Sequence, residues 1–335
     1  MFRKFFVAFT SALLLQQAAY AGEQIRAVGS STVYPFVTVA AESFGRSSSH
    51  KTPIIESTGT GGGFNLFCSG ADGQSPDLSN ASRQIKQRER DLCAKNGVNN
   101  ITEIKIGYDG IVLANTAGAR SYALTKQQLF MALAKKVPAA GKLVANPHMK
   151  WSDIDASLPD IKIEVYGPPP TSGTRDAFVE LVMEKACVDL PEFKAAYQNK
   201  SARKKACHVL REDGAFIEAG ENDNLIVQKL NNNDDALGIF GFSFLDQNAS
   251  TIQGSKIDGV QPTFESISSG KYPVSRPLYV YLKDEHVGQT PGLKEFVQEL
   301  VSNNAIGEEG YLIDRGLIPL PEAELVALQK EIDSK

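Results

Sequence analysis

The stretch Ser172-Gly173-Thr174-Arg175-Asp176-Ala177-Phe178 indicates how this chain is built. It follows a run typical of a strand, 161–166, and it opens a helix whose apolar residues recur at helical spacing. Ser172 is a good N-cap, so backbone N–H groups remain free in the first turn. Those donors, the hydroxyls and the helix dipole predict an anion site, to which Arg175 adds a planar positive charge. Ordinary helix capping would also explain a single turn of this kind.

The same arrangement of strand, small hydroxyl residues and helix recurs along the chain. The four segments are 29–32, 58–63, 79–83 and 172–175. Strands alternate with helices throughout, which predicts an α/β fold with mostly parallel sheets. In such folds ligands bind beyond the carboxyl ends of the strands, beside helix N-termini. If the four segments converge, they would surround a small tetrahedral anion with hydroxyls, amides and one or two arginines.

Residues 57–64, Ser-Thr-Gly-Thr-Gly-Gly-Gly-Phe, would let the backbone approach a ligand closely. They are not a dinucleotide-binding fingerprint, because Phe64 stands where glycine or alanine is required, and no Gly-Lys-Ser/Thr closes a P-loop. A flexible surface loop is the alternative for this segment alone. Further on, Asp109-Gly110 is expected to interrupt a strand at 104–115.

Composition and the N-terminus indicate an exported, soluble protein. The 335 residues allow two domains, and 22% charged residues with a net charge of −4 do not suggest a nucleic-acid-binding protein. Arg3 and Lys4 precede an apolar run, and Ala19-Tyr20-Ala21 provides small residues before a cleavage point. Residues 1–21 are therefore predicted to be a signal peptide, and a periplasmic location fits.

The four segments, in this order, resemble the phosphate-binding proteins of bacterial high-affinity phosphate ABC transporters. The matching runs are Gly-Ser-Ser-Thr-Val-Tyr-Pro-Phe, Ser-Thr-Gly-Thr-Gly-Gly-Gly-Phe, Asn-Ala-Ser-Arg and Thr-Ser-Gly-Thr-Arg-Asp. The resemblance covers essentially the whole mature chain. It implies a two-lobed type II periplasmic-binding-protein fold with two hinge crossovers and two mostly parallel sheets flanked by helices. It also implies a monomer without cofactor or catalytic activity that clamps inorganic phosphate and delivers it to a membrane permease.

The resemblance also implies which residues contact the anion. The first-lobe contacts fall on Ser31, Thr32, Thr60 and Gly61, and the second-lobe contacts on Ser172, Gly173 and Thr174. This chain departs from the family in two places. Residues 167–170 lack the arginine that precedes Ser-Gly-Thr in well-known members, and Ser82 replaces an aspartate. Arg83 and Arg175 are candidates to supply the missing positive charge.

By analogy with the two crossovers, lobe 1 is expected at 22–110 plus 278–335 and lobe 2 at 111–277, with hinges near 109–110 and 276–277. Four cysteines allow three disulfide pairings. Cys68–Cys93 and Cys187–Cys207 are favoured, because each pair would stay within one lobe. A metal site is the alternative use of the cysteines, but no CxxC occurs and the four histidines are scattered.

Several alternatives remain open. The ligand could be another oxyanion such as sulfate, or an organophosphate, and an adhesin or sensor could reuse the fold. A secreted phosphate-ester hydrolase would need an activated nucleophile or metals, and Ser172 has no sequence-local base or G-x-S-x-G frame. A carboxylate that accepts a phosphate O–H would favour phosphate over sulfate. With serine at position 82, Glu56, Asp109 and Asp213 are the candidates.

Overall fold

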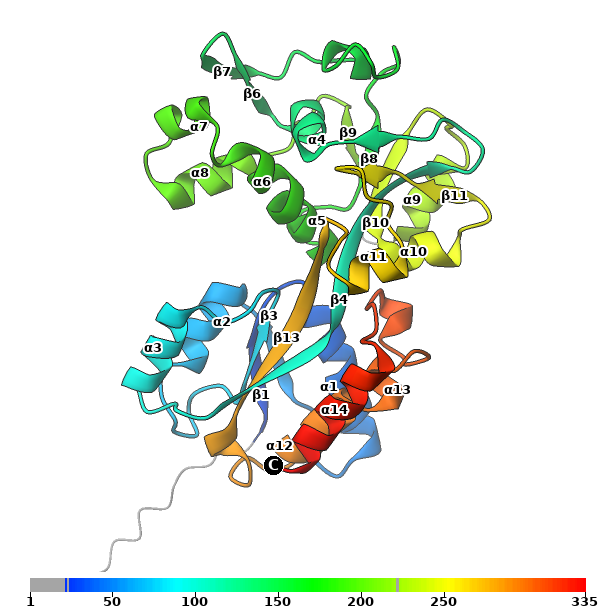
Figure 1. The fold of residues 1–335 in the computed structure, drawn as a ribbon. Helices are drawn as coiled ribbons and strands as arrows, with labels where there is room; N and C mark the ends of the chain where they lie inside the picture. Colours follow the sequence, from blue (N-terminus) through cyan, green and yellow to red (C-terminus); the bar gives the residue numbers. More distant parts are fainter. Residues whose placement is uncertain (1–21, 23, 221–222) are drawn as a thin grey trace, which may run out of the picture.

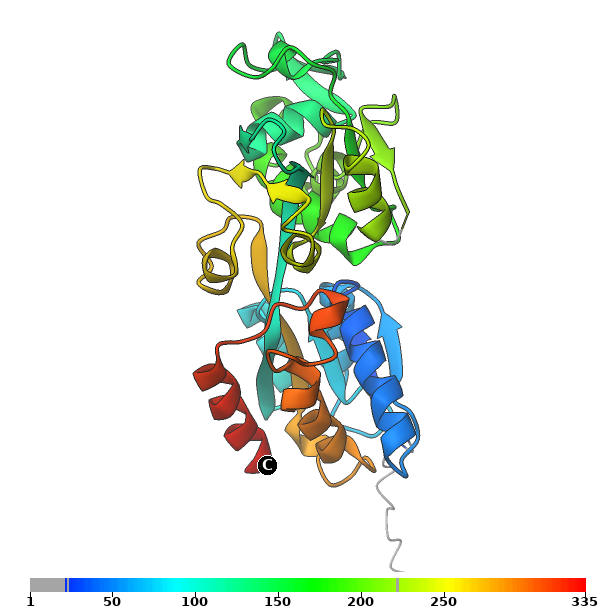
Figure 2. The ribbon, with the colours of Figure 1, turned by 90° about the vertical axis from the view of Figure 1, so that its right-hand side faces the viewer.

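The computed structural model describes residue 22, residues 24–220 and residues 223–335. Two lobes are joined by two strands that pass from one lobe towards the other, β4 (Ile101–Thr116) and β13 (Ser275–Lys283) (Figure 1). Figure 2 shows the lobes stacked end to end, with β4 running between them. The predicted signal peptide, 1–21, lies outside the described residues.

The crossover strands link the lobes into one nine-stranded sheet. Its order is β2-β1-β3-β13-β4-β10-β8-β9, with β11 (Ile252–Gly254) also paired to β4. Three strands in each lobe are parallel, as predicted, whereas the crossover strands pair antiparallel with their neighbours. The parallel sets are therefore joined through β4, which pairs first with β13 and then with β10 (Leu237–Gly241).

The expected interruption of this strand at Asp109-Gly110 is wrong. Both residues pair with β13, opposite Arg276 and Ser275. Gly110 allows close packing and does not form a turn, because a Cβ there would lie 2.8 Å from the Ile267 side chain. The irregularity in the ladder lies nearby, between Leu278 and Tyr279 of β13.

Lobe 1 contains the first three strands and the C-terminal helices. Its α1, α12 and α14 pack side by side (Figure 2). Its elements are β1 (Arg26–Gly29), α1 (Tyr34–Ser47), β2 (Ile54–Ser57), α2 (Thr60–Phe67), β3 (Leu78–Ala81), α3 (Gln87–Lys95), η3 (Asp284–His286), α12 (Leu293–Leu300), α13 (Asn303–Ile306), η4 (Ile313–Arg315) and α14 (Glu322–Asp333).

Lobe 2 holds the second parallel set, which includes β10, and also the strand β11, which pairs antiparallel with β4. Its other elements are β5 (Ala123–Leu124), α4 (Lys126–Leu133), β6 (Lys136–Ala139), β7 (Lys142–Ala145), η1 (Trp151–Asp153), β8 (Val165–Gly167), α5 (Gly173–Phe178), η2 (Val179–Met183), α6 (Glu184–Cys187), α7 (Pro191–Ala196), α8 (Lys200–Cys207), β9 (Phe216–Glu218), α9 (Asp223–Leu230), α10 (Phe242–Gln247), β12 (Lys256–Ile257) and α11 (Phe264–Ser268).

The strand predicted at 161–166 is shorter in the structure, where β8 begins at Val165. The residues before it pair locally: Lys162 bridges to Lys150, and Ile163 N donates to Met149 O at 2.8 Å. The segment is extended, but its first half serves a local connection and not the sheet.

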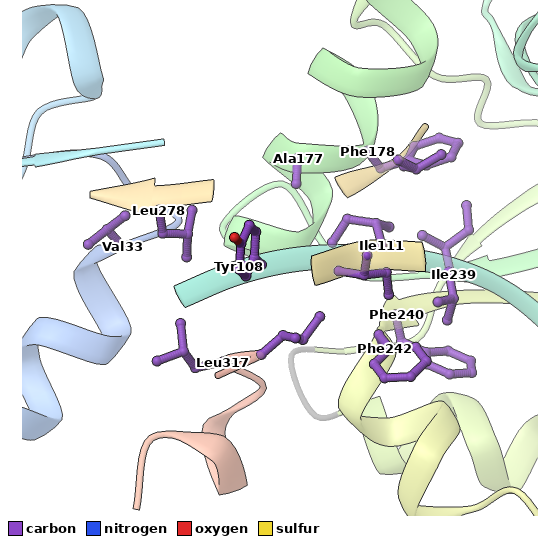
Figure 3. Packing of buried hydrophobic residues seen from close by; sticks show 14 of the residues in the cluster. Val33, Tyr108, Ile111, Ala177, Phe178, Ile239, Phe240, Phe242, Leu278 and Leu317 are labelled. Atoms are coloured by element: carbon purple, nitrogen blue, oxygen red, sulfur yellow. The ribbon is translucent and has the colours of Figure 1, made fainter. Parts of the chain in front are cut away.

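The hydrophobic core is continuous through the crossover region. Tyr108 and Ile111 of β4 lie between Leu278 of β13 and apolar side chains of lobe 2 such as Phe240 (Figure 3). A smaller cluster around Phe64 fixes α2 and α3 to β13. Burial of apolar surface on both sides of the crossovers stabilises the hinge strands as well as each lobe.

The structure contains both predicted disulfides. Cys68–Cys93 joins the end of α2 to α3, and Cys187–Cys207 joins the end of α6 to the end of α8. Each lies within one lobe, which is the reason that favoured these pairings.

Candidate functional site

The end of β1 builds the first part of the site. Ser30 N donates to Asn80 O at 2.9 Å, and Thr58 N donates to Gly29 O at 2.8 Å. Gly29 has φ +138°, and a Cβ there would lie 2.1 Å from Asn80 O, so only glycine fits. The loops after β1, β2 and β3 are thereby held against one another at the carboxyl edge of the lobe 1 strands, as the strand order requires.

The glycine-rich loop brings two predicted hydroxyls together. α2 begins at Thr60, after Gly59 in a left-handed conformation at φ 72°. Thr60 Oγ1 lies 3.2 Å from Ser82 Oγ and also accepts from Ser82 N at 3.2 Å. A Cβ on Gly63 would lie 2.5 Å from Gly29 Cα, so the start of α2 can rest directly on the β1 loop. The segment is a closely packed helix start and not a flexible loop.

A cavity of about 760 Å³ opens between the lobes at this edge. Six of the predicted ligand residues line it, namely Ser31, Thr32, Thr60, Gly61, Ser82 and Arg83. Lobe 2 contributes Glu180, Leu181 and Glu184 from the helical stretch that begins with α5. The three first-lobe segments of the predicted constellation therefore do converge.

Arg276 contributes a positive charge at this cavity that the sequence reading missed. Its side chain is 8% exposed; Nη2 donates to Thr32 Oγ1 at 2.7 Å, and Nη1 pairs with Glu180 Oε2 at 2.5 Å. Its Nε lies 3.5 Å from Asp109 Oδ2, and neither atom has a hydrogen-bond partner among the described residues. The sequence placed Arg276 only near a hinge, as it did Asp109, because the register that sets the two residues opposite each other is a property of the folded sheet.

The second-lobe residues lie on the other side of Ser31 and Thr32. Ser172 caps α5, accepting from Thr174 N at 3.2 Å as predicted. A Cβ on Gly173 would lie 3.0 Å from Thr32 Cα, and Ser31 Oγ donates to Asp176 Oδ2 at 2.5 Å. The start of α5 thus rests directly on the β1 loop of lobe 1.

As a result, Ser172, Gly173 and Thr174 line a second cavity, of about 690 Å³. Ser31 and Thr32 border both cavities. The predicted constellation is therefore divided: the lobe 1 hydroxyls face one cavity, the Ser-Gly-Thr turn faces the other, and the Ser31-Thr32 pair separates them.

Arg175 does not take the position expected for a counter-charge. Its guanidinium lies 4.5 Å from the centre of the Phe216 ring, and Nη1 donates to Pro168 O at 2.9 Å. Glu218 lies at 3.7 Å, burial lowers the pKa of Arg175, and the side chain lines neither cavity. The turn of α5 points this residue towards lobe 2, which helical position alone did not reveal.

Arg83 does line the first cavity but is already paired. Its guanidinium bonds both carboxylate oxygens of Glu89, at 2.9 and 2.8 Å, and lies over the Phe64 ring. Burial would raise the pKa of Glu89, but hydrogen bonds from Arg83 and the Lys86 backbone outweigh it and lower that pKa. Arg83 is thus held at the cavity with its charge largely compensated.

Among the candidate acids, Asp109 is the one that borders a cavity. Glu56 pairs with Arg26 at 3.2 Å and Asp213 with Arg211 at 2.6 Å, and neither lines a cavity described above. Asp109 is 8% exposed and lines the second cavity, where burial raises its pKa against the opposing charge of Arg276. Asp223, not foreseen from the sequence, lies there too, and burial raises its pKa to about 6.

Metal ligation has no evident support in the described residues, among which no group of three or more His, Cys, Asp or Glu could hold an ion. Within the same residues, no helix combines the length and apolar character needed to span a bilayer.

Residues 16–304 match the model of the PBP superfamily domain. The phosphate-binding protein PstS of Staphylococcus epidermidis is 31% identical over 294 residues, which is 85% of this chain and 77% of that protein. The chain belongs to the PBP superfamily. Protein SphX of a Synechocystis strain is 30% identical over 303 residues, covering 88% of this chain and 77% of SphX.

Solved structures of the family agree in fold. A possible phosphate-binding protein from Planctomyces limnophilus superposes with a TM-score of 0.75 at 26% identity, covering 94% of this chain and 99% of that one. PstS from Borrelia burgdorferi gives a TM-score of 0.59 at 15% identity, covering 89% and 99% of the two chains, which supports the two-lobed fold alone. The predicted fold class and family resemblance are confirmed.

Proposed function

We propose that this protein captures inorganic phosphate between its lobes and delivers it to the permease of an ABC transporter. The observation that carries the proposal is the cavity where Thr32, Thr60 and Ser82 meet the buried guanidinium of Arg276. Hydroxyl groups and one arginine suit a tetrahedral oxyanion, because they supply several directed donors without a dense positive charge. The names of the PstS relatives agree with this ligand.

In this proposal Arg276, and not Arg175, is the main counter-charge. A bound phosphate would accept from Arg276 and from the hydroxyls of Thr32, Thr60 and Ser82, with Ser31, Gly61 and Arg83 completing the first-lobe wall. Such charge-assisted hydrogen bonds are roughly twice as strong as neutral ones.

Closure of the lobes would then involve the turn formed by Ser172, Gly173 and Thr174. This turn already contacts the β1 loop, so a small rotation about β4 and β13 would change its position relative to Thr32. The proposed lobe boundaries, 22–110 plus 278–335 and 111–277, are supported by the pairing of Asp109 with Arg276. Both crossovers pass between the lobes at that level.

The surroundings of Ser172 support a binding role rather than that of a nucleophile. Ser172 Oγ accepts a backbone N–H as the cap of α5. Ser31 Oγ does donate to the Asp176 carboxylate, at the contact between the two lobes. A serine nucleophile needs an adjacent general base that removes its proton during attack. We therefore propose a non-enzymatic, monomeric, exported protein without a cofactor, in agreement with the predicted signal peptide and the two disulfides.

Calorimetry with phosphate and sulfate, beside native mass spectrometry of the purified protein, tests this function. Phosphate is expected to bind one to one and to outcompete sulfate at equal concentration. A phosphomonoester turnover assay run in parallel should give no product above the uncatalysed background. Tighter binding of sulfate, or turnover that depends on Ser172, would contradict the proposal.

A further inference from the structure

The residues that line the first cavity differ in exposure. Thr32 and Arg276 are 6% and 8% exposed, whereas Lys86 and Lys185 are exposed to solvent. Cavities of about 300–1,000 Å³ typically hold ligands of drug-like size. At about 760 Å³, this cavity offers more room than one five-atom anion needs.

Besides Arg276, four cationic side chains line this cavity, two from each lobe. Arg83 and Lys86 belong to lobe 1, and Lys185 and Lys204 to the α6 and α8 region of lobe 2. Figure 1 shows that α6 and α8 lie on the same side of the molecule as α2 and α3, across the space between the lobes. A ligand in this cavity would therefore meet positive charge from both lobes.

Part of this charge is compensated and part is not. Glu184 bonds Lys204 and also His208 Nε2, the latter at 2.9 Å. Burial opposes ionisation of Glu184, but its hydrogen bonds with His208 and Lys204 outweigh burial and lower its pKa to about 2. In contrast, no ion pair within 4.0 Å to a described carboxylate is found for Lys86 or Lys185.

Lys86 lies within reach of the positive charge of other cations. Partial burial and the charges of Arg83, Arg88 and Lys204 lower the pKa of Lys86. Lys204 acts here from the opposite lobe. An anionic group between the two lobes would relieve this repulsion, while an uncharged group would leave it in place.

We propose that the cleft also binds condensed phosphate, with one phosphoryl group at Thr32 and Arg276 and the next at Lys86 and Lys185. This inference rests on the proposed function, because Thr32 and Arg276 must first accept a phosphoryl group. The positive charge of Lys86 and Lys185 favours a second phosphoryl group over the uncharged part of a phosphate monoester.

Calorimetry with diphosphate, phosphate and glycerol phosphate tests the inference on the full mature protein. Diphosphate is expected to bind and to compete with phosphate. The double variant Lys86→Met/Lys185→Met should weaken diphosphate binding roughly tenfold, as loss of two partly exposed ion pairs would do, and change phosphate binding less than about twofold. Lys205→Met, an exposed residue of α8 outside the cavity lining, is the matched control and should leave both affinities unchanged.

The outcomes separate this inference from the proposed function. If phosphate binds and diphosphate does not, or if the double variant weakens both equally, the lysines only attract anions in general and the inference is wrong. The inference is also wrong if glycerol phosphate binds as tightly as diphosphate and the two lysine substitutions change neither affinity. If neither phosphate nor diphosphate binds, the proposed function itself fails.

Discussion

Arg276 Nε lies 3.5 Å from Asp109 Oδ2, at the level where the two crossover strands pair these residues. The same guanidinium donates to Thr32 of lobe 1 and pairs with Glu180 of lobe 2. One buried side chain on a hinge strand thus contacts the proposed phosphate site and both lobes. Ligand binding and lobe position are coupled wherever a ligand interacts differently with two lobe arrangements.

Replacing Arg276 by methionine is expected to lower phosphate affinity by roughly one to two decades, the loss of a charge-assisted hydrogen bond worth about 1.5–3 kcal/mol. Calorimetry measures the affinity, and thermal unfolding follows the stability, since Glu180 and Asp109 also lose their partner. Arg175→Met is the control, because that guanidinium lies over Phe216 and outside both cavity linings. Equal losses in the two variants would contradict the assignment of Arg276.

Asp109→Asn tests whether the second cavity, which Asp109 lines beside Thr32, takes part in the choice of phosphate over sulfate. If lobe closure brings this carboxylate to the anion, the substitution is expected to narrow the preference for phosphate over sulfate. Phosphate near neutral pH keeps at least one proton, which a carboxylate can accept, whereas sulfate carries none and is repelled. Loss of this acceptor should weaken phosphate binding by roughly tenfold and leave sulfate unchanged or tighter. Competition calorimetry gives the ratio. Asp213→Asn serves as the control, since Asp213 pairs with Arg211 outside the cavities, and an unchanged ratio in Asp109→Asn would exclude this carboxylate.

Asp223 predicts a pH dependence of stability. Its folded pKa, about 6, lies above the unfolded value near 3.9, so the native state holds the proton more tightly. The stabilisation from this group is present below about pH 4 and is lost as the pH rises through about 6, a change of about 3 kcal/mol. Asp223→Asn should remove that part of the pH profile and be more stable than the unsubstituted protein at pH 7.

Urea unfolding from pH 4 to pH 8 measures this difference. Asparagine can still accept from Gly241 N, the 3.3 Å contact of Asp223, so the variant isolates the charge. Asp246→Asn, at an exposed position of α10, should follow the unsubstituted profile. Parallel profiles for all three proteins would show that Asp223 has no raised pKa.

The disulfide between Cys187 and Cys207 is expected to stabilise lobe 2 by about 3 kcal/mol, as loop closure over its separation of 20 residues suggests. The double variant Cys187→Ser/Cys207→Ser should therefore unfold at lower urea concentration. Phosphate affinity should stay close to that of the unsubstituted protein, because the bond lies at the ends of α6 and α8. If the double variant folds fully but binds phosphate much more weakly, the disulfide instead helps to hold the phosphate site in place.

Local sequence predicted the parts of the site that depend on neighbours in the chain. Gly29 ends β1, Thr60 follows β2 after a short turn and Ser82 directly follows β3. The carboxyl ends of such parallel strands meet at one edge. The two disulfide pairings also followed from the expected lobe layout, because each pair would stay within one lobe. These features need only the order of strands and helices.

The role of Arg276 could not be predicted in this way. It depends on the antiparallel register between β13 and β4, which brings together residues far apart in the sequence. Arg175 was assigned to the site because it stands in the first turn of α5, but helix position does not say which lobe a long side chain will pack against. The Arg175 guanidinium packs on the ring of Phe216 in lobe 2. Phe216 is distant from Arg175 in the sequence, so this contact could not be predicted.

Gly173→Ala tests whether the start of α5 takes part in the clamp. Alanine fits the helical backbone there and is favoured over glycine by up to about 1 kcal/mol, so the unliganded protein should be as stable or more stable. However, the added Cβ would lie 3.0 Å from Thr32 Cα and 3.3 Å from Ser31 O, closer than ordinary contact. The lobes would have to separate by a few tenths of an ångström, which opposes closure on phosphate.

We therefore expect opposite effects of this substitution on stability and on affinity. Calorimetry should show phosphate binding weakened by roughly tenfold, a cost of about 1.4 kcal/mol, while the thermal midpoint is unchanged or higher. Gly70→Ala, where the nearest atom lies at 3.6 Å, is the control and should change neither quantity greatly. If Gly173→Ala binds phosphate as well as the unsubstituted protein, the contact between α5 and Thr32 is structural packing, and the Ser-Gly-Thr turn is not part of the clamp.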